Sequence, residues 1–150
     1  MANTYTSLQY HVVFSTKGRE PWLSEVVCAR LWPYLGGIAR QNGMKALEIG
    51  GVADHVHLLL AIPPSLSLSR SMQLLKGASS RWVHENFAAL AGFGWQDGYG
   101  AFTVSGSRIS RVRKYIRDQP EHHRVTTFAE EYEEFLQKHG VEYEKRYLLG

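Results

Sequence analysis

The feature that most constrains the fold is the run DHVHLLL at residues 54–60, which two prolines follow at Pro63 and Pro64. An apolar, β-prone run that ends at proline is typical of a strand, in which alternate side chains point to the same face. His55 and His57 are therefore predicted to lie side by side. The opposite face is filled by Val56, Leu58 and Leu60. Two imidazoles at this spacing can bind one metal ion, but such a pair is also common as surface or hydrogen-bonded histidines.

Five further segments complete a predicted α+β fold. Strands are expected at residues 6–15, 44–51 and 99–105, and amphipathic helices at 24–42 and 68–85. The order strand, helix, strand, strand, helix, strand predicts a ferredoxin-like sandwich, with helices on one face of an antiparallel sheet and C-terminal helices added. The length of 150 residues, without repeats or linkers, indicates a single domain over residues 1–150. The strand before the histidines predicts that Glu48 lies near them.

A helix is predicted at about residues 107–119, and its polar side is unusual. At about 100° per residue, one face carries the apolar residues Ile109, Val112 and Ile116. An adjacent face, within roughly 40°, carries Arg108, Arg111, Tyr115 and Gln119. Two guanidinium groups, a phenol and an amide on one side of a helix indicate a functional surface. Tyr115 taken alone would be interpreted as a semi-buried aromatic at the helix edge.

A C-terminal helix is predicted at about residues 127–139. Its apolar stripe consists of Phe128, Tyr132, Phe135 and Leu136, and Gly140 ends it. We expect this helix to pack on the body of the protein and to keep its acidic face away from DNA.

The charge is uneven along the chain. Residues 1–120 carry 13 Lys and Arg against 7 Asp and Glu, whereas residues 121–150 carry 4 against 7. A basic body fits a polyanion partner, because basic side chains gain affinity for phosphates through counterion release. It equally fits a mildly basic protein without such a partner.

The chain has one cysteine, Cys28, which excludes an intrachain disulfide framework and a Cys-rich zinc site and favours a reducing compartment. The first residues lack a charged region followed by an apolar one, and no apolar run approaches the ~20 residues that span a bilayer. We therefore expect a soluble, cytoplasmic protein without a membrane partner.

Four motifs occur in a specific order: DHVHLL at 54–59, LKGASS at 75–80, GYGAF at 98–102 and YIRDQPEHH at 115–123. Together they resemble the TnpA-type single-tyrosine HUH transposases of the smallest bacterial insertion sequences, over nearly the whole chain. Relatives that act on repeated extragenic palindromes share these motifs, and the sequence does not separate the two groups.

The resemblance implies a metal-dependent DNA strand transferase. Tyr115 occupies the position of the nucleophile, which attacks a phosphodiester, forms a 5′-phosphotyrosine intermediate and releases a 3′-OH. His55, His57 and Gln119 occupy the positions of the ligands of a divalent metal, Mg²⁺ or Mn²⁺. The family acts as a homodimer on hairpins of single-stranded DNA, and its tyrosine helix can serve the metal site of the partner subunit.

Tyrosine suits strand transfer, because a phosphotyrosine ester keeps the energy of the broken bond. Since the pKa of a phenol is near about 10, nearby positive charge from Arg111 or Lys114 is expected to activate it, and no general base is evident. Contacts to DNA phosphates are expected from Lys76, Arg81, Arg108, Arg111, Arg113 and Lys114, and base stacking from Trp95, Tyr99 or Phe102. The alternative is that these are solvated helix faces and core aromatics.

Two other functions fit parts of the sequence. A domesticated relative that binds or nicks DNA hairpins explains the basic face, but a non-catalytic one leaves Tyr115 and its neighbours unused. A two-histidine phosphoesterase needs two His-x-Ser/Thr motifs, and here His57 is followed by Leu58 with no second copy.

Overall fold

Four antiparallel strands form the central sheet of the computed structural model, which describes residues 3–148. They are β1 (Gln9–Ser15), β2 (Lys45–Val52), β3 (His55–Ala61) and β4 (Gly100–Val104), in the spatial order β2-β3-β1-β4. Helix α1 (Glu25–Gln41) connects β1 to β2, and α2 (Leu68–Asn86) connects β3 to β4. The predicted ferredoxin-like order of elements is confirmed.

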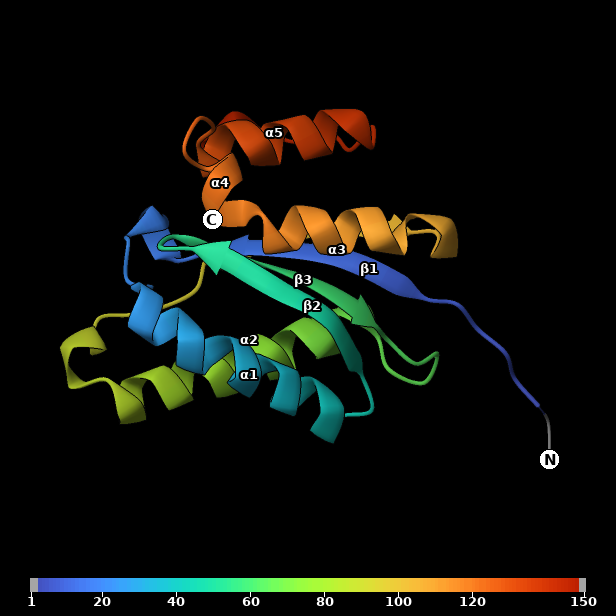
Figure 1. Cartoon of the computed structure of the whole chain (residues 1–150), viewed down its shortest axis with the longest axis horizontal. Coiled ribbons are helices and arrows are strands. Elements are labelled where there is room, and N and C mark those ends of the chain that lie inside the picture. Colours follow the sequence, from blue (N-terminus) through green and yellow to red (C-terminus); the bar gives the residue numbers. More distant parts are fainter. Residues whose placement is uncertain (1–2, 149–150) are drawn as a thin grey trace.

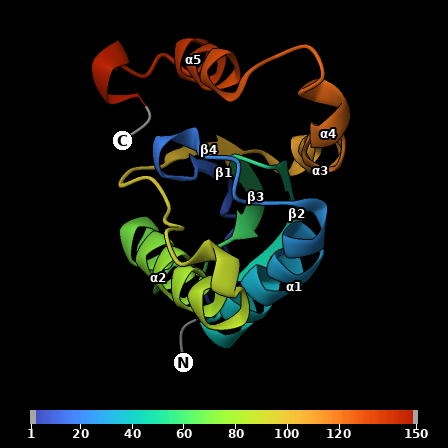
Figure 2. The same cartoon turned by 90° about the vertical axis from the view of Figure 1, so that its left-hand side faces the viewer.

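Helices cover both faces of this sheet (Figure 1, Figure 2). Helices α1 and α2 lie on one face, and the C-terminal helices α3 (Ile109–Arg117), α4 (Gln119–His122) and α5 (Phe128–Lys138) lie on the other. Short 3-10 turns occur at Lys17–Arg19, Ala88–Leu90, Gly106–Arg108 and Lys145–Tyr147. The helix predicted at about 107–119 is thus divided after Arg117. Pro120 has no N–H to donate to the carbonyl of Ile116, so it ends α3 and opens α4.

The larger core lies between the sheet and α1 and α2. Val56, Leu58 and Leu60 of β3 are fully buried in it, as the strand alternation predicts. Ser24 caps α1 by accepting a hydrogen bond from the Val27 N–H (3.3 Å). The other face of β3 is left to the histidines and to the C-terminal helices.

Helix α3 rests on β2 at a glycine. Ile116 is fully buried, and a Cβ added to Gly50 would lie 2.5 Å from the Ile116 carbonyl oxygen. Gly50 is the cross-strand partner of His57. This close approach therefore determines how near α3 lies to the sheet beside the histidines of β3.

We expect Gly50→Ala to destabilise the protein by about 1–3 kcal/mol, because the methyl group must push the α3 backbone away. For a chain of this length, thermal melting should fall by roughly 3–10 °C. Gly77→Ala is the matched control, since Gly77 lies in α2 with nothing within 4 Å of its added Cβ. Alanine there should keep or raise the melting temperature. If Gly50→Ala melts like the wild type, α3 does not rest on β2 in this way.

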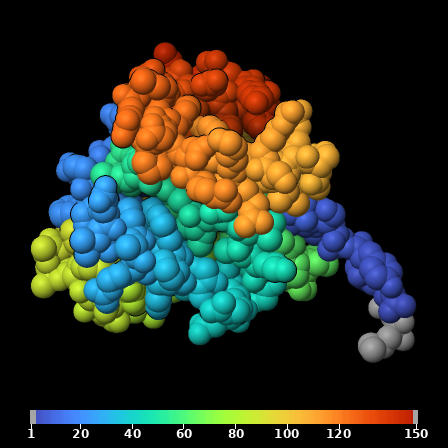
Figure 3. Space-filling model, in the orientation of Figure 1, coloured from blue at the N-terminus to red at the C-terminus, as the bar shows by residue number. Residues whose placement is uncertain are grey.

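Helix α5 packs over β1 and β4, on the face of the sheet that α3 also covers. Its residues Phe128, Tyr132 and Leu136 pack against Val13 and Phe102. In Figure 3 the C-terminal helices form a layer above the sheet, and the N-terminal segment projects from the body. Among residues 3–148, the structure has no helix that is both long enough and apolar enough to cross a membrane.

Candidate functional site

Strand β3 supplies the two histidines of the site. His55 and His57 are fully buried, and their ring centroids are 5.1 Å apart. Asp54 accepts a hydrogen bond from His55 Nδ1 (2.7 Å), and His57 Nδ1 shares one with His11 Nε2 (2.7 Å). The outer nitrogen of each ring is thus held by a neighbour, and both Nε2 atoms are directed toward the C-terminal helices.

Helices α3 and α4 bring the predicted tyrosine and glutamine to these histidines. Gln119 is fully buried, and its Oε1 lies 3.1 Å from His55 Nε2. Tyr115 is partly buried, and its ring centroid is 5.7 Å from that of His57. The four residues predicted from the resemblance therefore lie together within one chain, and their roles stay predictions.

Glu131 of α5 occupies the centre of the cluster, although the sequence predicts a helix with its acidic face outward. The side chain is 2% exposed. Its Oε1 lies 3.0 Å from His57 Nε2 and 3.1 Å from His123 Nε2. Its Oε2 accepts hydrogen bonds from Gln119 Nε2 (3.2 Å) and from the Tyr115 hydroxyl. The acidic helix is thus part of the site as well as of the core.

The electrostatics of the cluster follow from burial and from this carboxylate. Burial opposes ionisation of Glu131, but the surrounding imidazoles of His123, His55 and His57 hold its pKa well below its usual range. Burial and then the charge of Glu131 raise the pKa of Tyr115, so its phenol is protonated at neutral pH.

The two strand histidines are affected in opposite directions. Burial would lower the pKa of His55, but the carboxylates of Asp54 and Glu131 outweigh it and raise this pKa to about 9. Burial lowers the pKa of His57 to about 4, despite the nearby Glu131. The site therefore contains one imidazole that holds a proton and one that offers a free electron pair.

The donor chemistry of the cluster fits a metal ion. One ligand atom from each of His55, His57, His123 and Glu131 lies within 4.8 Å of the others. Imidazole nitrogen and carboxylate oxygen are ligands of divalent metals, and the partners that orient the rings are of the kind found around such sites.

The predicted DNA-binding residues fall into four places, and Lys76 lies apart from the others. Arg108 and Arg111 line a cavity of about 310 Å³ together with Tyr115 and Glu131. Arg113 and Lys114 lie on another side of α3 and form ion pairs with Glu48 (3.3 Å) and Asp118 (2.7 Å). Arg81 is exposed on α2, across the sheet from α3.

Glu48 corrects one sequence-based prediction. It pairs with Leu59 in the register and forms ion pairs with Arg113 and Arg117 of α3. It does not join the histidine cluster, because Ile116 fills the space above Gly50, which lies between Glu48 and the histidines on that face.

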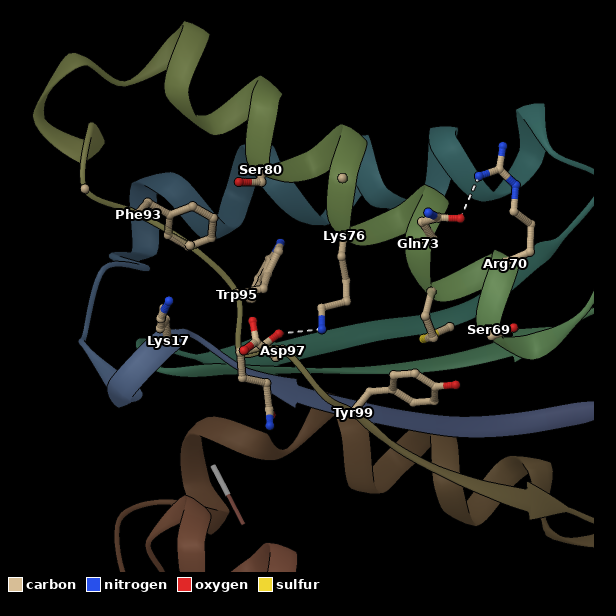
Figure 4. Close-up of a pocket in the computed structure, with 15 residues that line it drawn as sticks. Lys17, Ser69, Arg70, Gln73, Lys76, Ser80, Phe93, Trp95, Asp97 and Tyr99 are labelled. Atoms are coloured by element: carbon tan, nitrogen blue, oxygen red, sulfur yellow. Dashed lines mark hydrogen bonds between the residues drawn. The ribbon is translucent and has the colours of Figure 1, made fainter. Parts of the chain in front are cut away.

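Lys76 lies in a separate open groove of about 960 Å³, which Figure 4 shows. Its Nζ donates hydrogen bonds to the carbonyl oxygens of Gln96 (2.5 Å) and Gly98 (2.8 Å). Lys76 thus holds the loop that follows α2, and its contact with DNA stays a prediction. Tyr99 also lines this groove.

The burial of Trp95 and Phe102 favours the alternative that these rings are core aromatics. Trp95 is 7% exposed, packs edge-to-face on Phe14 and donates a hydrogen bond to Ser79 (2.9 Å). Phe102 is 5% exposed and stacks on Phe135. Both rings belong to hydrophobic cores, and Trp95 also borders the groove that contains Lys76.

Comparison with known proteins identifies the family. The family model described as "Transposase IS200 like" matches residues 4–119, which include both histidines, Tyr115 and Gln119. The chain belongs to the IS200-like transposase family. It is accordingly a transposase, an enzyme that transfers DNA strands in recombination.

Two curated relatives of this IS200-like transposase are similar over most of their length. The ISDra2 transposase TnpA of Deinococcus radiodurans is 33% identical over 117 residues, which cover 75% of this chain and 84% of the relative. The transposase for insertion sequence element IS200 of Salmonella typhimurium is 33% identical over 127 residues, covering 81% and 82%.

Solved structures agree with this fold. A candidate transposase from Deinococcus radiodurans R1 matches with a TM-score of 0.65 and 31% identity, over 79% of this chain and 96% of that one. A REP-associated tyrosine transposase bound to a REP hairpin matches with a TM-score of 0.59 over 82% of this chain and 74% of that one. At 14% identity, the second match supports the fold alone.

Four residues around the site of this IS200-like transposase were not predicted from its sequence: His11, His122, His123 and Glu131. Glu131 did carry a signal, since it lies three residues after Phe128 and four before Phe135, inside the apolar stripe of α5. A charged residue at such a position has to be paired when the helix docks. His123 comes four residues after Gln119, and His11 is an isolated polar residue in a strand.

Proposed function

We propose that the protein is a metal-dependent transposase that cleaves and rejoins single-stranded DNA at hairpin-marked sites, with Tyr115 as the nucleophile. The observation that carries this proposal is that Tyr115, His55, His57 and Gln119 converge on one carboxylate inside a single chain. A tyrosine beside two histidines and an amide suits phosphoryl transfer to the protein and back.

In the first step the Tyr115 oxygen forms a bond to phosphorus, and the bond from phosphorus to the 3′ oxygen breaks. The products are a 5′-phosphotyrosine and a free 3′-OH, and attack by another 3′-OH reverses the step. Glu131 Oε2 accepts the Tyr115 hydrogen bond, so it is positioned to receive the phenol proton as the new bond forms, and the departing 3′ oxygen takes up a proton from water. A divalent ion, Mg²⁺ or Mn²⁺, held by His55, His57 and Gln119 would supply Lewis-acid polarisation of the scissile phosphate.

Arg108 and Arg111 are the basic residues best placed to hold that phosphate. Both line the cavity of about 310 Å³ that contains Tyr115, and both are exposed. Guanidinium groups bind phosphate oxygens through paired N–H donors. Arg113 and Lys114 form ion pairs with Glu48 and Asp118 on another side of α3, and their role in this proposal is a weaker contact with the DNA strand.

The partners in this proposal are a DNA hairpin and a second copy of the chain. A solved transposase with the same fold is bound to a REP hairpin, which is the kind of partner in this proposal. For the second, β4 is the last strand of the sheet, so one backbone edge is open to pairing with β4 of another copy. Tyr115 lies beside the histidines of its own chain, which supports cleavage within one subunit.

Covalent capture tests the proposal. Purified protein is incubated with a pool of hairpin-bearing single-stranded DNAs and Mn²⁺ or Mg²⁺, and denaturant-stable adducts are isolated and sequenced. We expect an adduct that maps to Tyr115, requires a divalent ion and disappears with a chelator. Clear binding of the pool without any adduct would contradict the proposal and favour a non-catalytic hairpin binder.

A further inference from the structure

Two side chains beyond the family-matched residues 4–119 enter the histidine cluster. Glu131 comes from α5, and His123 from the segment between α4 and α5. Glu131 Oε1 lies 3.4 Å from His55 Nε2, 3.0 Å from His57 Nε2 and 3.1 Å from His123 Nε2. One carboxylate oxygen thus faces three imidazole nitrogens.

The hydrogen positions on two of these rings follow from their outer partners. His55 Nδ1 faces Asp54 Oδ1 (2.7 Å), and His123 Nδ1 faces the Thr126 carbonyl oxygen (2.6 Å). Both partners only accept hydrogen bonds, so each Nδ1 carries the hydrogen. In the neutral rings, each Nε2 then presents an electron pair to the interior of the cluster.

The oxygens opposite these nitrogens are also electron-pair donors. Gln119 Nε2 donates to Glu131 Oε2 (3.2 Å), which leaves Gln119 Oε1 facing His55 Nε2 at 3.1 Å. Glu131 Oε1 faces the same nitrogen. Electron pairs directed at one another in a buried space repel, unless a proton or a metal cation lies between them.

The spacing of the donors matches such a cation. Bonds of about 2.1 Å to a divalent ion place neighbouring ligand atoms about 3.0 Å apart in octahedral and about 3.4 Å apart in tetrahedral geometry. The separations of Glu131 Oε1 from the three Nε2 atoms are 3.0 to 3.4 Å. The four ligand atoms all lie within 4.8 Å of one another, so small side-chain shifts would bring them to a shared ion.

We propose that Glu131 and His123 are ligands of the metal centre, so that α5 and the segment before it complete the site. The inference rests on the proposed function, which places the metal on His55, His57 and Gln119. It adds a carboxylate and a third imidazole to that set.

This ligand set has a consequence for metal choice. Three imidazoles favour Mn²⁺ and later transition ions over Mg²⁺, which prefers oxygen ligands. We expect Mn²⁺ to bind the wild-type chain at least about 10-fold more tightly than Mg²⁺.

Glu131 also connects the metal centre to the nucleophile. Its Oε1 faces the imidazoles, and its Oε2 accepts the hydrogen bond of the Tyr115 hydroxyl. A carboxylate bound at one oxygen is fixed at the other, so Glu131 positions Tyr115 relative to the ligands.

Calorimetric titration of the full chain with Mn²⁺, without DNA, tests the inference. Glu131→Gln and His123→Gln should each weaken Mn²⁺ binding by about 10-fold to 100-fold or more. Glu130→Gln is the matched control, because Glu130 is exposed on the same helix, and its affinity should stay within about two-fold. Paramagnetic resonance of bound Mn²⁺ should change in the first two variants only.

Thermal melting without metal checks that the variants fold. If Glu131→Gln does not fold, His123→Gln decides the question. Unchanged affinity in the folded variants overturns the inference, as does tighter binding by Glu131→Gln, which would make Glu131 an obstacle to the metal. If the wild type binds Mn²⁺ through these residues but forms no DNA adduct, the proposed function fails while this inference stands. An active wild type with unaffected variants would defeat this inference alone.

Discussion

The Tyr115→Phe variant is expected to form no covalent adduct with DNA and to lose strand cleavage by more than about 10³-fold, while it binds the same hairpins within about two-fold. The magnitude follows from the chemistry, because removing the nucleophile of a covalent mechanism leaves no group for the new bond. Gel separation under denaturing conditions measures the adduct, and filter binding or anisotropy measures the affinity.

The fold of this variant should survive. Phenylalanine keeps the ring that lies edge-to-face on Phe135 (5.7 Å) and His11 (6.0 Å). The lost hydroxyl leaves Glu131 Oε2 with the Gln119 hydrogen bond (3.2 Å), so the cost should be about 1 kcal/mol. A loss of cleavage in this variant therefore reports the chemistry of the hydroxyl.

Tyr132→Phe is the matched control. Tyr132 is a buried tyrosine, 6% exposed, on the face of α5 that meets the sheet. It packs with Phe128 outside the histidine cluster. This variant should form the adduct as the wild type does. An adduct that persists in Tyr115→Phe would assign the nucleophile to another hydroxyl, and peptide mapping would locate it.

Local periodicity was sufficient to predict half of the site. Side chains alternate in a strand, so His55 and His57 had to share a face once β3 was recognised. The helical periodicity predicted that Arg108 and Arg111 share a face with Tyr115. In the structure all three line one cavity. These arrangements depend on residues a few positions apart, which sequence patterns describe directly.

Contacts between distant segments were beyond such patterns. Glu131 enters the cluster because α5 docks through Phe128 and Tyr132 on strands more than twenty residues away. Its position inside the apolar stripe distinguishes it from the other glutamates of α5, but does not say which residues it meets. The surroundings of Lys76 and Trp95 also depend on contacts between distant segments. The loop after α2 folds back, so its carbonyls cap Lys76 and Trp95 fills the core. The periodicity of a helix or a strand does not predict where such a loop packs.

The double variant His55→Gln/His57→Gln is expected to lose Mn²⁺-dependent stabilisation and to lower adduct formation by more than about 10³-fold. When the free Mn²⁺ concentration is one hundred times the Kd for Mn²⁺, binding stabilises the folded wild type by about 2.7 kcal/mol. That corresponds to a rise of roughly 5–10 °C in the melting temperature, which the double variant should not show. Melting curves with and without Mn²⁺ measure the difference.

Glutamine is chosen because both histidines are fully buried beside Glu131, and alanine would remove two polar partners of this carboxylate. His84→Gln is the control, since His84 is exposed on α2 and bonds the Phe93 carbonyl oxygen (2.7 Å), away from the cluster. It should keep both the Mn²⁺ shift and the adduct. A double variant that retains the full shift would place the ion elsewhere. One that loses the shift but still forms the adduct would separate metal binding from the tyrosine chemistry, because Tyr115 and Glu131 would then suffice for cleavage.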